Sequence, residues 1–529
     1  MATPHQKLAT SLEALRELQS GGRRVFRSKQ LKRADRERLL RNGFIQEIMP
    51  SWLISSSASA RDGDSTPWYT SFWEFCAFYC DARFGAAWHL SPEQSLLLLT
   101  EHTIVPRQVV VCSPKGTNNK VDLPFGTSIY DLKQSSMPPA ADLIVRDGLR
   151  LFSNVAVLAR VTETAYRTNP IEIRVLLESV RDASEVLSRL LEGGHSRIAG
   201  RVAGAFRHVN RPEVADEILK TMKAAGYDVR ETNPFKDEPP LEIAPRHNPP
   251  IVTRLQALWR NTRSTVLELF PEPPGLPADK EAYLQSIDEI YAADAYNSLS
   301  IEGYNVSPAL IEQVRSGNWN PDLIEADRQQ RDALAARGYW QAFRIVKSDI
   351  ARIIAGENPG ELVKTTHRDW YRELFAPCVV AGLINLSALA GYRNDAVYLR
   401  QSRHVPPRWE AVRDAMPALF DLIGNEPSPA VRAVLGHWLL GYVHPYPDGN
   451  GRMARFLMNA MLASGGYPWT VVRLENRAAY LAALEQASVE NDVRPFVVFI
   501  AESMKQTASR TLHAAGGLQE LSAATVRPR

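Results

Sequence analysis

The sequence predicts a multidomain protein in which an N-terminal winged helix and an α/β domain precede an all-helical C-terminal half. The chain has 529 residues, which corresponds to about three domains at roughly 100–200 residues each. Helix and strand patterns mix in the first half, whereas helical patterns dominate the second. Between them, residues 233–250 hold six prolines in eighteen positions, which is typical of an extended linker.

The composition is that of a folded globular protein, with 45% hydrophobic and 23% charged residues and a formal net charge of +3. That charge is unevenly distributed along the chain. Residues 1–42 carry eleven Lys or Arg and only four Asp or Glu, a surplus of seven positive charges. A basic segment on a mildly acidic body suggests a polyanionic partner.

The four cysteines are too few for a disulfide framework and favour a reducing compartment. Cys76 and Cys80 are four residues apart in an aromatic run, and no second Cys or His pair has zinc spacing, so we expect a buried pair. The N-terminus lacks the apolar core of a signal peptide, and no apolar run reaches 18 residues. We therefore expect a cytoplasmic protein with no membrane contact.

Residues 1–58 predict a winged helix-turn-helix. Leucines with helical spacing predict a first helix over about 9–19, SKQL at 28–31 a helical turn, and 34–43 a further helix that ends at Gly43. The alternating stretch 44–54, interrupted by Pro50, then predicts a hairpin or wing. Three helical segments followed by a hairpin are the winged helix-turn-helix order.

The basic residues of this segment favour a DNA partner. The third helical segment, which corresponds to the DNA-recognition helix of a winged helix, carries four arginines: Arg33, Arg36, Arg38 and Arg41. The alternative is a solvated basic face on a small helical domain, and the pattern identifies no base-reading residue.

Residues 59–232 predict an α/β domain. We expect helices over about 68–84 and 92–103, then β-rich runs at 107–114, around 129–133 and from Leu149 to Val161, and helices again over 170–226. With the basic head, this half resembles the AbiEi-like antitoxin and regulator proteins. The resemblance rests on the GGRRVF step at 21–26, the predicted wing, and NPF at 233–235 after AAGYDV.

The strongest chemical signal is HPYPDGNGRMAR, from His444 to Arg455, between one helix that starts near Ala430 and another that follows directly. Gly449 and Gly451 permit a loop whose backbone N–H groups form an anion nest at a helix N-terminus. Arg452 and Arg455 share one face of that helix even though its dipole disfavours cations there. This pattern indicates a multivalent anion such as a nucleotide polyphosphate.

Two further residues of the loop suit catalysis on such a ligand. Asp448 offers a hard oxygen for Mg²⁺ that bridges phosphates, and His444 is the residue suited to act as a base near neutral pH. The alternative is a glycine-rich helix connection with incidental polar residues.

The same residues resemble the Fic family motif HPFx(D/E)GNGRxxR, with Tyr446 in the Phe position. The resemblance implies a mostly α-helical Fic domain over about 251–505 that moves AMP from ATP to a Ser, Thr or Tyr hydroxyl of a protein. It implies that His444 accepts the hydroxyl proton and Asp448 binds Mg²⁺. It also implies a phosphate-binding set, with Gly449, Asn450 and Gly451 at the α-phosphate and Arg452 and Arg455 at the β- and γ-phosphates.

The resemblance extends to two further segments. Residues 391–409 alternate and then break at two prolines, like the β-hairpin flap of Fic enzymes, so Leu399 and Arg400 are expected to align the target by strand addition. Tyr480 and Ser488 match the segment around the nucleotide base. Core packing is the alternative for Tyr480, and Ser488 stands where relatives often carry Asn.

An upstream motif, SLSIEG at 298–303, resembles the inhibitory helix motif (S/T)xxxE(G/N) of Fic proteins. Ser298, Glu302 and Gly303 match it, and the resemblance implies that Glu302 pairs with Arg455 and withholds it from the γ-phosphate. The alternative is a solvated helix end. Tyr304 departs from the Asn common at the next position, and residues 506–529 are expected to form a tail.

Rival functions remain open from the sequence. One is a related enzyme that uses another nucleotidyl or phosphoryl donor or removes AMP from a modified protein. The other is a DNA-binding, antitoxin-like regulator that uses the Fic half as a nucleotide sensor. The sequence also leaves a homodimer open and does not specify the target protein.

Overall fold

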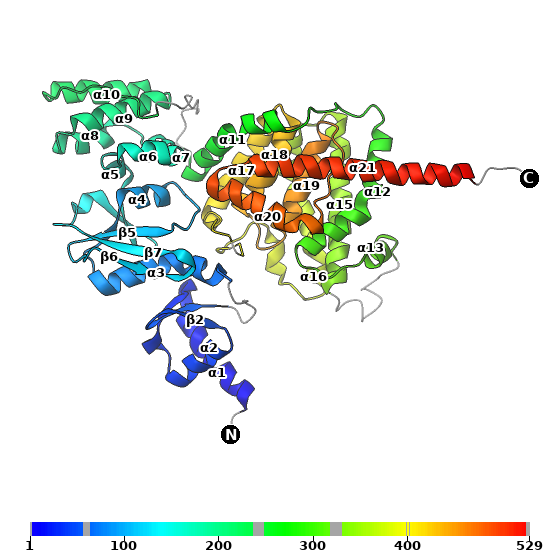
Figure 1. Cartoon of the computed structure of the whole chain (residues 1–529), viewed down its shortest axis with the longest axis horizontal. Coiled ribbons are helices and arrows are strands. Elements are labelled where there is room, and N and C mark those ends of the chain that lie inside the picture. Colours follow the sequence, from blue (N-terminus) through cyan, green and yellow to red (C-terminus); the bar gives the residue numbers. More distant parts are fainter. Residues whose placement is uncertain are drawn as a thin grey trace, which may run out of the picture. The chain divides into compact units, whose positions relative to one another are not determined.

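The computed structural model describes residues 3–56, 64–235, 248–317, 331–397, 399–400 and 402–524. Figure 1 shows the order of its elements along the chain. The chain forms two compact units: Met1–Arg254 with Tyr398–Val405, and Leu255–Val397 with Pro406–Arg529. Residues 236–247 of the predicted linker and 525–529 of the predicted tail lie outside the described residues.

The first unit begins with two helices and a three-stranded antiparallel sheet in the order β1-β3-β2. A Thr3 and Gln6 capping box starts the first helix, and a 3₁₀ turn at Ser28–Gln30 precedes the second. The predicted helices and hairpin are present, and the short strand β1 is an addition. The elements are α1 (Pro4–Leu18), β1 (Val25–Arg27), α2 (Arg33–Arg41), β2 (Ile45–Met49) and β3 (Trp52–Ser55).

This small sheet has two packed faces, because successive side chains of a strand point to opposite sides. Leu53 packs into a small core with Leu15 and Leu39 of the two helices. Its neighbours Trp52 and Ile54 belong to the larger core that the following helices and strands build. The segment predicted as a separate domain over 1–58 therefore shares one compact unit with the α/β segment.

The α/β segment contains a four-stranded sheet in the order β4-β5-β7-β6, in which only β5 and β7 are parallel, and a two-stranded sheet of β8 and β9. Eight helices precede, separate or follow these strands along the chain. The strands are β4 (His89–Leu90), β5 (Gln108–Ser113), β6 (Asn119–Asp122), β7 (Ser128–Lys133), β8 (Leu143–Arg146) and β9 (Leu149–Phe152). The helices are α3 (Thr66–Phe84), α4 (Pro92–Leu99), α5 (Asn154–Leu158), α6 (Glu163–Thr168), α7 (Pro170–Ser179), α8 (Ala183–Glu192), α9 (Ser196–His208) and α10 (Pro212–Ala224).

One sequence prediction in this segment is wrong. The β-rich run expected from Leu149 ends at Phe152, because the Ser153 side chain accepts a hydrogen bond from the backbone N–H of Ala156 and starts α5. The buried-pair prediction is confirmed, since Cys76 and Cys80 are both buried, free cysteines on α3.

The second unit is helical, as predicted, and its described residues contain no strand. In Figure 1, α18 and α19 lie side by side within it, and α19 also packs against α15 and α16. Nearly every residue of α19 is buried, which makes it the central helix of the unit. The helices are α11 (Pro250–Leu269), α12 (Lys280–Ile301), α13 (Pro308–Arg315), α15 (Arg331–Ala355), α16 (Pro359–Val380), α17 (Trp409–Asn425), α18 (Pro429–Val443), α19 (Asn450–Ala463), α20 (Arg477–Glu485) and α21 (Arg494–Ala524).

None of the helices that the structure describes is both long enough and apolar enough to cross a membrane.

Candidate active site

The predicted motif forms the loop between α18 and α19. His444 ends α18 in the left-handed conformation, with φ of 50°, and Gly449 starts α19 with φ of 79°. A Cβ atom on Gly449 would lie 2.8 Å from Cε2 of Phe375, so both the backbone angle and the close packing require glycine.

Asn450 fixes the shape of this loop from inside. Its Oδ1 accepts a hydrogen bond from the backbone N–H of Tyr446 at 2.9 Å, and its Nδ2 donates to the Tyr446 carbonyl at 2.8 Å. The Tyr446 ring in turn stacks on Tyr371 at 4.0 Å between centroids. The side chain of Asn450 is thus used within the loop, which leaves only its backbone N–H for the predicted phosphate contact.

His444 is a neutral base in this environment. Burial lowers the pKa of His444 to about 4. Its Nδ1 lies 3.4 Å from the Gly441 carbonyl, which can only accept, so we assign the ring proton to Nδ1. Nε2 then carries the lone pair that a general base needs.

Arg452 lies in the first turn of α19 as an unusually placed cation. Its side chain is 1% exposed, and its guanidinium lies between the rings of Tyr304 and Phe375, 5.2 Å and 5.0 Å from their centroids. Within the described residues, its Nε and Nη2 atoms have no hydrogen-bond partner, and Nη2 has only a 3.7 Å ion pair with the exposed carboxylate of Asp448. Buried donors of this kind are unfavourable without an acceptor, so the pair of atoms fits an anionic ligand.

Arg455, one turn later, is held by the end of α12. Its Nε donates to the Ser298 hydroxyl at 2.8 Å, and its Nη2 donates to the Ser298 carbonyl at 3.0 Å and to Glu302 Oε1 at 2.7 Å. Burial would raise the pKa of Glu302, but the guanidiniums of Arg455 and Arg452 bring it below its usual value. The carboxylate is therefore ionised and paired with Arg455, which favours the motif interpretation over a helix end that is only solvated.

Glycines allow this close approach. Gly303, with φ of 89°, terminates α12 directly after Glu302. A Cβ on Gly451 would lie only 2.2 Å from Glu302 Oε1. The carboxylate consequently reaches the first turn of α19 itself, beside the nest of N–H groups.

The same face of α12 carries a third polar residue one turn earlier. Asp294 is buried and accepts a hydrogen bond from the Tyr339 hydroxyl at 2.5 Å. Asp294, Ser298 and Glu302 are spaced by four residues, so they follow one side of the helix.

Asp448 presents a carboxylate at the mouth of the loop. Its side chain is 60% exposed, and its Oδ1 accepts a hydrogen bond from the Gly449 N–H at 2.6 Å. Among the residues that the structure describes, no three His, Cys, Asp or Glu side chains gather into a metal site. A single carboxylate fits Mg²⁺ that phosphates and water also coordinate, which is the usual arrangement for a nucleotide-bound ion.

The two residues predicted near the nucleotide base lie in the core. The Tyr480 hydroxyl is 2.7 Å from Nε2 of His437, and the Ser488 hydroxyl accepts a hydrogen bond from Trp438 Nε1 at 3.0 Å. Both side chains are buried against α18. This geometry favours core packing for Tyr480, which the sequence left open as the alternative. The same interpretation applies to Ser488.

The predicted β-hairpin over 391–409 is wrong for the described residues. The backbone of His404 and Val405 pairs with residues 103–105 of the first unit and not with the other predicted strand of the hairpin. Pro406 and Pro407 cannot continue a strand pairing, because proline has no N–H to donate. Leu399 is half-buried and Arg400 is exposed, and neither belongs to a strand. Their role in target alignment stays a prediction.

The arginines predicted to bind DNA do not form one exposed stripe. Arg33 and Arg41 are exposed, and Arg33 pairs with Glu37 at 2.7 Å. Arg36 and Arg38 are half-buried: Arg36 donates to the Ser28 carbonyl at 3.4 Å, and Arg38 donates to the Lys7 carbonyl at 3.0 Å.

Comparison with known proteins agrees with this site. Residues 360–462, which contain the motif loop and both arginines, match the model of the Fic/DOC family. This segment is a Fic/DOC domain. Apart from residues 398–405, which belong to the first unit, the domain falls in the second unit and includes α17, α18 and most of α16 and α19.

Curated relatives extend the similarity beyond the Fic domain. A protein adenylyltransferase Fic of Nematostella vectensis is 30% identical over 265 residues, which cover 47% of this chain and 55% of the relative. One of Drosophila willistoni is 31% identical over 247 residues, which cover 46% of this chain and 44% of the relative. The chain thus spans about half the length of the curated relatives that it matches.

Solved structures show weaker similarity. Fic-1 (aa134 - 508) from C. elegans is 18% identical, with a TM-score of 0.37 over 68% of this chain and 92% of that one. A Fic domain containing signaling protein from Bacteroides thetaiotaomicron is 21% identical, with a TM-score of 0.35 over 49% of this chain and 97% of that one.

Two residues of the Fic site were missed in the sequence. Phe375 packs on Gly449 and Arg452, and Arg393 donates from Nε to the His444 carbonyl at 2.8 Å. Neither has a local motif, because each acts through a tertiary contact with residues at least 50 positions away. A third residue, Tyr304, could have been found from the sequence, because it departs from the Asn of related motifs. The structure explains this departure, since the Tyr304 ring contacts the guanidinium of Arg452.

Proposed function

We propose that the protein is an adenylyltransferase that moves AMP from ATP to a Ser, Thr or Tyr hydroxyl of another protein. The observation that carries the proposal is the pair of buried guanidiniums, Arg452 and Arg455, beside a neutral His444 on one loop and helix. The names of the curated relatives support the choice of AMP transfer.

In this reaction, His444 Nε2 accepts the proton of the target hydroxyl as its oxygen attacks the α-phosphorus. A new P–O bond forms to the target, the bond between the α-phosphorus and the bridging oxygen breaks, and pyrophosphate leaves. Backbone N–H groups at Gly449, Asn450 and Gly451 stabilise the developing negative charge. Arg452 binds the β- and γ-phosphates, and Asp448 holds Mg²⁺, which neutralises phosphate charge when bound.

The Glu302–Arg455 pair makes the described state an inhibited one. Arg455 is a strong phosphate ligand only when its donors are unoccupied, and its Nη2 is committed to Ser298 and Glu302. ATP therefore binds without its full set of cationic contacts until the end of α12 releases Arg455.

The test is AMP transfer from labelled ATP by the full-length Glu302→Gly variant added to cell lysate, with the modified proteins identified by mass analysis. We expect labelled protein bands only when the Glu302→Gly variant is present. These bands should be absent with the double variant that also carries His444→Ala. Labelling that persists with His444→Ala, or a transferred group other than AMP, contradicts the proposal.

A second candidate is the removal of AMP from a modified protein. An ionised Glu302 beside the first turn of α19 is placed to orient water toward a phosphorus held by the loop. Incubating AMP-modified target with wild-type protein distinguishes the two, because hydrolysis releases AMP and restores the unmodified mass, whereas a pure transferase leaves the target unchanged.

A separate DNA-binding role rests on the helices and hairpin before residue 57, in which α2 exposes Arg33 and Arg41. The full-length protein should bind duplex DNA with an affinity that falls as salt rises. The double variant Arg33→Gln with Arg41→Gln should weaken that binding; unchanged binding, or none at low salt, removes the role.

A further inference from the structure

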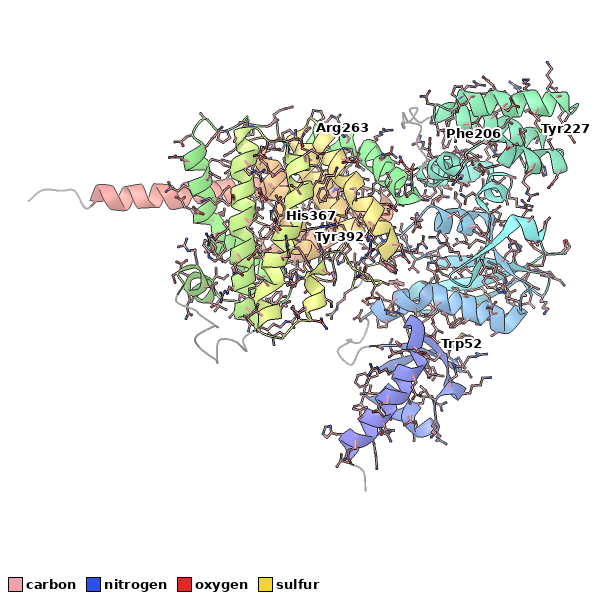
Figure 2. The ribbon with its side chains drawn as sticks, turned by 180° about the vertical axis from the view of Figure 1, so that it is seen from behind. Trp52, Phe206, Tyr227, Arg263, His367 and Tyr392 are labelled. Atoms are coloured by element: carbon pink, nitrogen blue, oxygen red, sulfur yellow. The ribbon has the colours of Figure 1, made fainter. Side chains whose placement is uncertain are left out.

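A cavity of about 460 Å³ lies in the second unit, outside the site described above. Side chains of α16, of α17 and of the loop after residue 390 line it, and Figure 2 shows two of them, His367 and Tyr392, next to each other. This volume is in the range of pockets that bind organic ligands, and it exceeds what a single inorganic anion requires.

The lining is cationic. Lys364, Arg368 and Arg413 contribute three positive charges, and no carboxylate lines the cavity among the described residues. Lys364 is ion-paired with Asp421 at 2.7 Å. No carboxylate in the described part of the chain forms an ion pair with Arg368 or Arg413, so these two guanidiniums are the uncompensated charges of the wall. Arg368 lies over the Tyr392 ring at 5.0 Å, and Arg413 donates to the Asn394 side chain.

The polar groups of the wall are donors more than acceptors. His367 Nδ1 is 2.8 Å from the Val363 carbonyl, so that nitrogen carries the ring proton and Nε2 accepts from the Tyr392 hydroxyl, also at 2.8 Å. Burial lowers the pKa of His367 to about 4, so the ring adds no charge near neutral pH. A ligand that complements this wall must bring acceptors and negative charge.

The cavity is joined to the catalytic loop through two adjacent residues. The Tyr392 ring, at the cavity, lies 5.7 Å from the ring of Tyr446 in the motif loop. Arg393, the next residue, donates from its backbone N–H to the Pro445 carbonyl at 2.9 Å and from Nε to the His444 carbonyl at 2.8 Å. The wall of the cavity is thus connected, through Tyr392 and its neighbour Arg393, to the loop that carries the proposed base.

We infer that this cavity binds an acidic side chain of the protein substrate, so that Arg368 and Arg413 select targets with Asp or Glu near the modified hydroxyl. The inference rests on the proposed function, because a protein substrate must reach the loop beside His444. A peptide is favoured over a free small anion because the cavity is larger than such an anion needs and because Tyr392 of its wall contacts Tyr446 of this loop.

The test is peptide binding to the full-length protein without ATP, measured by fluorescence anisotropy at constant ionic strength. The probes are two labelled peptides, one with Ser flanked by Asp and Glu and one with the same sequence carrying Asn and Gln. The variant Arg368→Gln with Arg413→Gln is compared with the control Arg372→Gln, an exposed arginine one turn along α16 that does not line the cavity.

We expect the acidic peptide to bind and the double variant to weaken that binding by at least about tenfold, since each charge-assisted contact is worth about a factor of ten. Arg372→Gln should leave binding within about twofold. Equal binding of the neutral peptide, no binding of either peptide, or an equal loss in Arg372→Gln overturns the inference.

A citrate titration separates the two sources of negative charge. If citrate binds with the same dependence on the double variant while the acidic peptide does not, the cavity belongs to a free anion and the inference is wrong. Because no ATP is present, a failure here is distinct from a failure of AMP transfer in the assay of the proposed function.

Discussion

Replacing Glu302 tests how strongly α12 restrains Arg455. In Glu302→Gln the amide keeps the shape of the side chain and an acceptor oxygen but loses the charge, whereas Glu302→Gly removes the contact entirely. The pair is a 2.7 Å contact in which Arg455 is 3% and Glu302 28% exposed, so solvent screens it only weakly.

The structure supports a graded effect. A hydrogen bond to a charged group contributes about 1.5–3 kcal/mol and a neutral one about 0.5–1.5 kcal/mol. The amide should therefore weaken the restraint by about 1 kcal/mol, or roughly fivefold, and the glycine by about 1.5–3 kcal/mol, or roughly 10- to 150-fold. The rate of AMP transfer should rise in the order wild type, Gln, Gly.

The assay is the initial rate of AMP incorporation from labelled ATP into the protein itself, at an ATP concentration well below saturation. Glu289→Gln, an exposed residue on the same helix, is the matched control and should keep the wild-type rate. Equal rates for all variants, or a Gln variant faster than the Gly variant, would refute the reasoning.

Three more outcomes follow from the same site. The rate of AMP transfer by the Glu302→Gly variant should be constant from about pH 6 to about pH 8 and fall only below about pH 5. The reason is that burial lowers the pKa of His444 to about 4, so the ring stays a neutral base above that pH. A rate that falls with a midpoint near pH 6.5 contradicts this. Asn450→Ala removes both bonds to the Tyr446 backbone and should lower the free energy of unfolding in urea by about 1–3 kcal/mol; an unchanged midpoint would show that the loop holds its shape without them. Tyr304→Ala should raise the KM for ATP by about two- to tenfold through loss of the cation–π contact to Arg452, whereas Tyr304→Phe should not; equal KM values for both variants would exclude that contact.

Sequence patterns correctly predicted the features that depend on the local spacing of residues. The helix–loop–helix around His444 and the helical second unit are present, and the structure contains the Glu302–Arg455 contact that the family resemblance implied. The inhibitory role of that contact stays a prediction. The two helical features depend on spacing within a few turns, whereas the Glu302–Arg455 contact joins residues 153 positions apart and was implied only by the resemblance.

What the sequence analysis did not predict depends on a local helix cap in one case and on tertiary packing in the others. The Leu149–Val161 run has the β-branched residues of a strand, yet a single cap at Ser153 turns its second half into a helix. The alternation of 391–409 predicts a hairpin, but the pairing of its backbone with residues 103–105 competes successfully with the local one. Tyr480 illustrates the same limit, since its position relative to His437 depends on how α20 packs on α18.

The restraint of Arg455 by α12 depends on which side of that helix carries its row of polar residues. Asp294, Ser298 and Glu302 share one side of the helix, and each residue added or removed before them rotates that side by about 100°. A one-residue insertion or deletion early in α12 would therefore turn Ser298 and Glu302 away from Arg455 and Asp294 away from Tyr339 together. A point substitution changes one contact and leaves the others in register. Length changes in this helix would switch the restraint off in a single step, and side-chain changes would adjust it by degrees.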